Sequence, residues 1–179
     1  SAASDVYKRQ RQMDKPIRLG IVGTGLQWQG SHQPALLSMP DRFEIRAAVV
    51  RDPVKLSKAI GEISGLKIYP TYASLVVDPD IDAVVVCMPI ALNAPVTIAA
   101  LDAGKHVFVE KPFAHNVLAG EQVIDAAHRA KRRVMILEQL LYTDAWDEIR
   151  AVIASGEIGT LAMYDHASHG FLDTQHDPW

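Results

Sequence analysis

The chain has 179 residues, of which 49% are hydrophobic and 22% are charged, an ordinary balance for a globular protein. Its net charge of −3 and pI near 6.1 argue against a nucleic-acid partner, because no basic stripe is present to meet phosphates. A single cysteine excludes an internal disulfide, and no apolar run reaches the roughly 18 residues of a membrane span, so we expect a cytoplasmic protein without a membrane partner.

Strands alternate with helices along most of the chain. Residues 1–12 are polar and aperiodic, and we expect them to be a leader foreign to the gene. The predicted elements that follow are a strand over 17–22, a helix over 31–39, a strand over 44–50, a helix over 52–60, a strand over 67–69, a helix over 74–77, a strand over 83–87, a helix over 94–103, a strand over 106–109, a helix over 118–130 and a strand over 134–137. This alternation predicts an α/β fold with a doubly wound parallel sheet, a Rossmann domain over residues 13–139.

The pattern changes near residue 140. A helix is predicted over 144–154, with Trp146 on its apolar face and therefore in a core. A longer strand is predicted over 159–169, with no helix after it. We interpret residues 140–179 as the truncated start of an α/β C-terminal domain.

A glycine turn follows the first strand and precedes a helix. In this context Gly23 makes the tight turn, and Gly25 lets the backbone approach a pyrophosphate at the helix N-terminus. Trp28 occupies the register of the third glycine of the pattern, and Gly30 could replace that glycine after a local insertion. A bare structural turn remains the alternative to dinucleotide binding.

The end of the second strand bears on which dinucleotide binds. An acid there would hold the ribose hydroxyl of NAD, whereas an arginine suits the 2′-phosphate of NADP. Val50 stands at the acid position and Arg51 follows it, which favours NADP over NAD. Arg51 could instead be a solvated loop residue, and Asp52 either a helix cap or a ribose ligand.

A carboxylate, an ammonium and a proline follow one another at the end of the strand over 106–109. The Lys111 ammonium can stabilise the alkoxide that develops during hydride transfer, and the neighbouring Glu110 would orient it and keep it charged. Pro112 fixes the turn. Taken in isolation, the three residues are more typical of a surface ion pair after a strand.

Several motifs together resemble one family, the Gfo/Idh/MocA oxidoreductases, over roughly residues 15–165. The motifs are Ile21-Val22-Gly23-Thr24-Gly25, Asp82-Ala83-Val84, Pro89, Ala100-Leu101-Asp102-Ala103-Gly104-Lys105-His106-Val107, Glu110-Lys111-Pro112 and Glu157-Ile158-Gly159. The resemblance implies a Rossmann domain followed by an α/β domain that forms the substrate site and often a subunit interface, so a homo-oligomer is expected. It also implies NAD(P)-dependent hydride transfer with a sugar, a polyol or a related ring hydroxyl as the small-molecule substrate.

The resemblance assigns roles to individual residues. Lys111 would contact the reacting hydroxyl and the nicotinamide ribose, with Glu110 and Pro112 orienting it. The cofactor contacts that it implies are Gly23, Thr24, Gly25, Leu26, Arg51, Met88, Pro89 and Asn93. A non-catalytic dinucleotide sensor of the same superfamily is the alternative, although a sensor has no need of Lys111.

Some positions depart from the family. Asn93 stands where a histidine is frequent, and residues 140–142 stand where an arginine-bearing segment is common. The catalytic Asp-x-x-x-His pair of the family is expected further downstream, because Asp173 and His176 are one residue too close. We therefore expect the chain to be inactive by itself.

The remaining candidate residues have plain structural interpretations. In a strand, His166 and His169 would point to opposite faces, so no metal site is predicted. His106 is expected to pack against the buried strand, and Cys87 to be a small apolar filler that faces the cofactor.

Overall fold

The computed structural model describes residues 15–50, 63, 65–138, 142–163 and 165. It divides into two compact units, residues 1–138 and 139–179. The described part of the first unit contains a six-stranded sheet. Its strands are β1 (Ile17–Val22), β2 (Phe43–Val49), β3 (Lys67–Tyr69), β4 (Ala83–Val86), β5 (His106–Glu110) and β6 (Val134–Leu137).

The strands lie in the order β3-β2-β1-β4-β5-β6, and each neighbouring pair is parallel. This confirms the predicted doubly wound Rossmann sheet. The direction in which successive strands are added reverses between β1 and β4, which are hydrogen-bonded neighbours. Ligands of such sheets bind outside the carboxyl ends of the strands at this reversal point.

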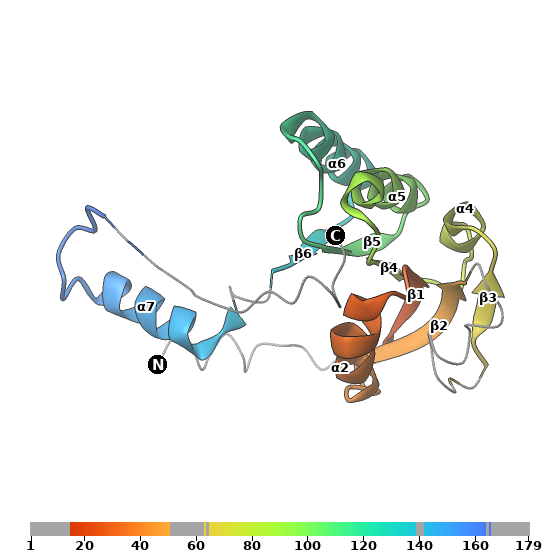
Figure 1. Ribbon diagram of the computed structural model, residues 1–179, viewed down its shortest axis with the longest axis horizontal. Coiled ribbons are helices and arrows are strands. Elements are labelled where there is room, and N and C mark those ends of the chain that lie inside the picture. Colours follow the sequence, from red (N-terminus) through yellow and green to blue (C-terminus); the bar gives the residue numbers. More distant parts are fainter. Residues whose placement is uncertain (1–14, 51–62, 64, 139–141, 164, 166–179) are drawn as a thin grey trace, which may run out of the picture. The chain divides into compact units, whose positions relative to one another are not determined.

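Helices cover both faces of the sheet. Figure 1 shows α5 and α6 on one side and α2 on the other. The helical elements are η1 (Trp28–His32), α2 (Gln33–Leu37), α4 (Tyr72–Val76), α5 (Ile90–Asp102), α6 (Val117–Ala130) and, in the second unit, α7 (Asp144–Ser155). The helix predicted over 52–60 falls outside the described residues.

Two helices begin earlier than predicted. The first helical segment begins at Leu26 rather than residue 31, and it passes through the π-helical η1. Its Trp28 side chain is fully buried against β1 and β2, and burying so large an apolar group stabilises the segment by about 3 kcal/mol. Helix α5 begins at Ile90 because Pro89 serves as its N-cap, so Pro95 lies beyond the first turn.

The core lies in two layers, one on each face of the sheet. Val84 and Val86 of β4 join the layer under α5 and α6, while Ala83 and Val85 join the layer that contains Trp28. This alternation follows from the side-chain period of 2 in a strand. All four residues of β4 are buried, as its continuous apolar run predicted.

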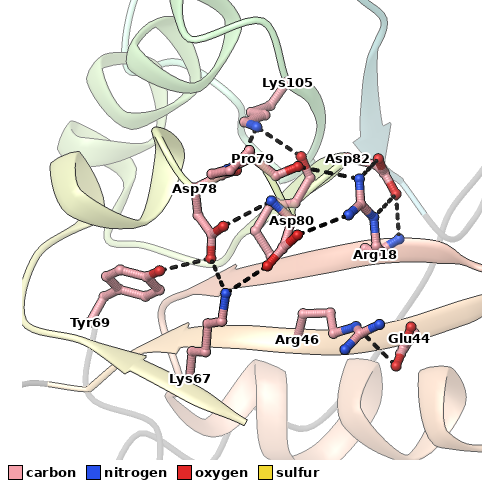
Figure 2. A network of polar contacts seen from close by, with 11 residues as sticks. Arg18, Glu44, Arg46, Lys67, Tyr69, Asp78, Pro79, Asp80, Asp82 and Lys105 are labelled. Atoms are coloured by element: carbon pink, nitrogen blue, oxygen red, sulfur yellow. Dashed lines mark hydrogen bonds and ion pairs between the residues drawn. The ribbon is translucent and has the colours of Figure 1, made fainter. Parts of the chain in front are cut away.

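The amino edge of the sheet is held by an ion-pair network, shown in Figure 2. The Arg18 guanidinium donates to Asp82 Oδ1 at 2.8 Å and to Asp82 Oδ2 at 2.9 Å. The Arg18 backbone N–H also donates to Asp82 Oδ2, at 2.9 Å. These bonds join the beginning of β1 to the residue before β4, and the guanidinium lowers the pKa of the Asp82 carboxyl.

A buried aspartate forms the second part of the network (Figure 2). Asp78 accepts hydrogen bonds from the Tyr69 hydroxyl at 2.7 Å and from Lys67 Nζ at 3.3 Å. Burial alone would raise the pKa of Asp78, but these bonds and one from the Asp80 backbone N–H together lower it. Lys105 Nζ donates to the Asp78 carbonyl at 2.7 Å, so this lysine has a structural role at the edge away from the glycine turn.

His106 begins β5 at the same amino edge. It is exposed rather than packed against the buried strand, because it precedes the first buried residue of β5, Val107. Its Nδ1 accepts a hydrogen bond from the Arg133 backbone N–H at 3.0 Å. The expectation that His106 packs inside is therefore wrong.

The second unit departs from its predictions. Helix α7 has no buried residue, and Trp146 is only partly covered, so its predicted core position is wrong. Residues 159–163 form no strand, because a strand needs a hydrogen-bonded partner and none of the described residues of this unit supplies one. Residues 166–169 of the predicted strand, with both histidines, lie outside the described residues.

Candidate active site

Three loops leave the carboxyl ends of β1, β4 and β5. Gly23 follows β1 with a φ of +102°, a conformation that favours glycine. A Cβ atom added to Gly23 would lie 2.1 Å from the carbonyl oxygen of Cys87, which follows β4. The backbone of the glycine turn is thus pressed against the neighbouring loop, and no side chain fits between them.

The second glycine of the turn lies in open space. A Cβ on Gly25 would meet no protein atom within 4 Å, and the helix begins at the next residue, Leu26. The Gln29 side-chain amide donates to the Thr24 carbonyl at 2.8 Å and holds the turn. The first N–H groups of a helix have no intrahelical partner, so this turn presents donors beside an open surface that suits an anion.

The proposed replacement for the third glycine is not supported. Gly30 is exposed, and a Cβ there would meet no atom within 4 Å, so the site needs no glycine for close packing. Trp28 instead lies inside the helix with its side chain in the core.

Glu110 is the last residue of β5 and is 7% exposed. Its Oε2 accepts the Lys111 backbone N–H at 3.0 Å, and its Oε1 lies 2.6 Å from His32 Nε2. The carboxylate therefore holds the backbone of Lys111 rather than its ammonium, so the alternative interpretation as a surface ion pair is wrong. The reason is the strand-like alternation of neighbouring side chains, which directs Glu110 inward and Lys111 outward.

Lys111 is exposed, and among the described residues no acceptor lies within hydrogen-bonding distance of its ammonium. The Lys111–Pro112 peptide bond is cis. The hydrogen bond from its backbone N–H to Glu110 anchors Lys111, while its charged end remains open to a ligand. This is the arrangement that a lysine acting on a bound hydroxyl requires.

Asn93, in the first turns of α5, links two of the loops. Its side chain is buried, and its Oδ1 accepts the Met88 backbone N–H at 3.2 Å. Its Nδ2 donates to the carbonyls of Glu110 at 3.3 Å and Pro112 at 3.0 Å. Both amide hydrogens are thus used internally, and the structure gives Asn93 a positioning role. Its contact with a cofactor stays a prediction.

Cys87 lies between the glycine turn and Glu110. Burial, with a smaller contribution from the Glu110 charge, raises the pKa of its thiol to about 12. The thiol packs against the apolar layer that contains Trp28, in line with the apolar role predicted for it. A thiol with so high a pKa is not a nucleophile at neutral pH.

The structure brings most of the predicted site residues to one edge of the sheet. They are Gly23, Thr24, Gly25, Leu26, Met88, Pro89, Asn93, Glu110, Lys111 and Pro112. Arg51 and Asp52, on which the choice of dinucleotide depends, lie outside the described residues, as do Asp173 and His176.

Sequence reasoning missed His32. It is 78 residues away from Glu110 along the chain, and its position depends on the π-helical turn of η1, for which the sequence carries no recognised signal. A histidine shortly after a glycine turn was the available hint. In the described residues no cluster of three or more histidine, cysteine or acidic side chains could hold a metal ion.

A cavity of about 1100 Å³ opens at the opposite, amino edge of the sheet. Its charged lining includes two internally satisfied pairs, Arg18 with Asp82 and Arg46 with Glu44. Because four of its charged side chains form these two pairs and it lies away from the glycine turn, the cavity is a weaker candidate for chemistry than the carboxyl edge.

Known proteins resemble this chain over most of its length. A model of an oxidoreductase family with an NAD-binding Rossmann fold, Gfo/Idh/MocA, matches residues 17–138. An uncharacterized oxidoreductase, ORF334 of Rhizobium meliloti, is 34% identical over 80% of this chain and 42% of its own length. Inositol 2-dehydrogenase 3 of Saccharopolyspora erythraea is 31% identical over 82% of this chain and 43% of its own.

A solved structure shows the same fold. The WlbA dehydrogenase of Bordetella pertussis, in complex with NADH and UDP-GlcNAcA, is 26% identical and superimposes with a TM-score of 0.75. The match covers 82% of this chain and 42% of that one. The chain thus spans less than half the length of the proteins it matches. None of its described helices is long and apolar enough to cross a membrane.

Proposed function

Because this chain belongs to the Gfo/Idh/MocA oxidoreductase family, we propose that it is the dinucleotide-binding part of an NAD(P)-dependent dehydrogenase that acts on CH–OH groups. The substrate class is a sugar, a polyol or a related ring alcohol. The observation that carries the proposal is the exposed Lys111 ammonium, anchored by its backbone at the carboxyl end of β5.

The carboxyl edge fits a dinucleotide. The open space around Gly25 leaves room for a pyrophosphate, and the beginning of the helix at Leu26 offers unpaired backbone donors. We expect Thr24, Met88 and Pro89, in the two adjacent loops, to contact the cofactor. We favour NADP over NAD because Arg51 follows the second strand.

When bound, the nicotinamide supplies the hydride acceptor or donor. Lys111 holds the substrate oxygen through a charged hydrogen bond and stabilises negative charge as the hydroxyl proton leaves. Glu110 fixes the Lys111 backbone, and Asn93 fixes the turn that Pro112 completes. We assign the transfer of the proton itself to an acid–base pair outside residues 15–165.

We further propose that the protein works in the cytoplasm as a homo-oligomer with a small-molecule substrate. The single cysteine suits a reducing compartment. A second α/β domain, begun by residues 140–179, would complete the substrate site and the subunit interface.

The test is turnover by the protein produced from its complete gene, followed through the absorbance of the reduced nicotinamide with a panel of sugars and polyols. Lys111→Met should lower kcat by about a hundredfold while dinucleotide affinity changes little. Lys131→Met, at another exposed lysine, is the matched control and should leave kcat unchanged. Dinucleotide binding without turnover on any alcohol would favour the sensor function.

A further inference from the structure

We propose that His32 is a positioning residue: it holds the Glu110 carboxylate and so couples the helix that follows the glycine turn to the backbone of Lys111. This inference rests on the proposed function, because it concerns how the catalytic lysine is placed. Nothing in the sequence pattern assigns His32 a role.

The contact between the two side chains is short and sheltered. His32 Nε2 lies 2.6 Å from Glu110 Oε1, and the two side chains are 19% and 10% exposed. A hydrogen bond to an ionised group in such a setting is stronger than an exposed one. A buried polar pair of this kind is also a poor way to gain stability, since an apolar pair of similar volume would serve as well or better. Its presence at this place therefore suggests a role in positioning.

The histidine is rigidly connected to the glycine turn. His32 is the last residue of η1, whose first residue is the fully buried Trp28. The Gln29 backbone N–H donates to the Gly25 carbonyl at 3.1 Å, so the same short segment joins the turn to His32. A pyrophosphate bound at the turn would therefore also hold His32 in place. Isolated π-helical turns are frequent at functional sites.

The glutamate connects His32 to the lysine. The two carboxylate oxygens have separate partners: Oε1 contacts His32, and Oε2 accepts the Lys111 backbone N–H at 3.0 Å. Without His32, Glu110 would remain buried with one oxygen unpaired, and it would rotate toward solvent or weaken its bond to Lys111. Gly25 is thus connected to Lys111 through the helical segment that contains His32, then through the Glu110 side chain.

Amide hydrogen exchange of Lys111, measured by NMR without any ligand, tests this coupling. His32→Asn keeps a polar amide but is too short to reach Oε1, and it should speed exchange of the Lys111 amide by about tenfold. His32→Gln, whose side-chain amide reaches the place of Nε2, should restore slow exchange. The Ala119 amide, which donates to Asn116 Oδ1 at 2.8 Å, is the matched internal control and should not change.

The exposed His128 of α6 provides a matched control variant, and His128→Asn should leave both amides as in the wild type. Unchanged Lys111 exchange in His32→Asn would overturn the proposal, and so would equal acceleration at Ala119, which would mean general loosening.

A second arm adds NADH or NADPH. Either one should slow Lys111 exchange in the wild type but not in His32→Asn, while the Gly25 amide signal shifts in both proteins. Slowing that persists in His32→Asn would overturn the coupling. If the wild type binds neither dinucleotide, the proposed function fails, and the ligand-free comparison still decides whether His32 positions Lys111.

Discussion

Gly23 and Cys87 stand in contact at the point where the strand order reverses, and the contact leaves no space for a Cβ atom on Gly23. A Cβ on Gly23 would lie 2.1 Å from the Cys87 carbonyl oxygen, and the φ of +102° is itself unfavourable for other residues. This contact fixes the distance between the glycine turn after β1 and the loop after β4. The turn is therefore a rigid part of the sheet edge.

Two alanine variants should separate folding from binding at this turn. Gly23→Ala should destabilise the protein by about 3 kcal/mol or more, because the backbone of the glycine turn and that of the loop after β4 must move apart. Gly25→Ala should cost less than about 0.5 kcal/mol, because its Cβ meets no protein atom, yet weaken dinucleotide binding at least about tenfold. Urea unfolding and fluorescence titration measure the two effects. Equal stability of the two variants would contradict this assignment.

The pKa of the Cys87 thiol depends on burial and, to a smaller extent, on the negative charge of Glu110. Because that negative charge helps to raise the thiol pKa to about 12, Glu110→Gln should lower this pKa. Alkylation by iodoacetamide at fixed alkaline pH should then be faster, since the thiolate is the reactive form. Cys87 is the single cysteine of the chain, so the measured alkylation rate belongs to this thiol. Asp125→Asn, an exposed acid on α6, is the control, and an unchanged rate in Glu110→Gln would refute the electrostatic link.

Asn93 should be among the most sensitive polar residues of the site. Asn93→Ala removes three hydrogen bonds from a buried position and leaves the Met88 N–H and two carbonyls without this partner, which should cost about 3 kcal/mol. Asn116→Ala, which removes the side-chain cap of α6, should cost only about 1 kcal/mol. Chemical denaturation gives both values, and a cost for Asn93→Ala no greater than that of the cap would disprove its role in holding the loops.

The amino-edge network predicts loss of stability in acid. The pKa values of Asp78 and Asp82 are lowered in the folded state below an ordinary value of 3.8. Their contribution is therefore fully present above that value and is lost as the pH falls through the lower, folded-state pKa values, because the unfolded chain binds protons first. Urea unfolding at a series of pH values should show this decline. In Asp82→Asn the free energy of unfolding should fall less steeply with decreasing pH. A fall as steep as that of the wild type would count against the network.

Much of the fold could be predicted from sequence because it depends on local patterns. The apolar run of β4 indicated a strand buried on both faces, and the predicted end of α5 and both predicted ends of α6 lie within one residue of those observed. Errors arose where packing decided instead. Burial of Trp28 moved a helix start by several residues, and the N-cap at Pro89 did the same for α5.

The sequence allowed us to predict which loops form the site, but not which side chains contact one another within it. The order of the strands places residues 23–25, 88–89 and 110–112 at one edge, and the motifs alone indicated this. The partner of Glu110 could not be inferred, because its contact with His32 depends on a π-helical turn and on a separation of 78 residues. Periodicity also placed Trp146 in a core, although α7 meets no described layer that would cover it.

Titration of the labelled protein with NADH and with NADPH, followed by backbone amide NMR shifts, tests the central claim most directly. The account predicts saturable binding with the largest shifts at Gly23, Gly25, Met88 and Lys111, and tighter binding of NADPH than of NADH. Amides of the amino edge, such as His106 and Arg133, should not respond. Absence of binding, or shifts concentrated around the cavity at that opposite edge, would contradict the placement of the site.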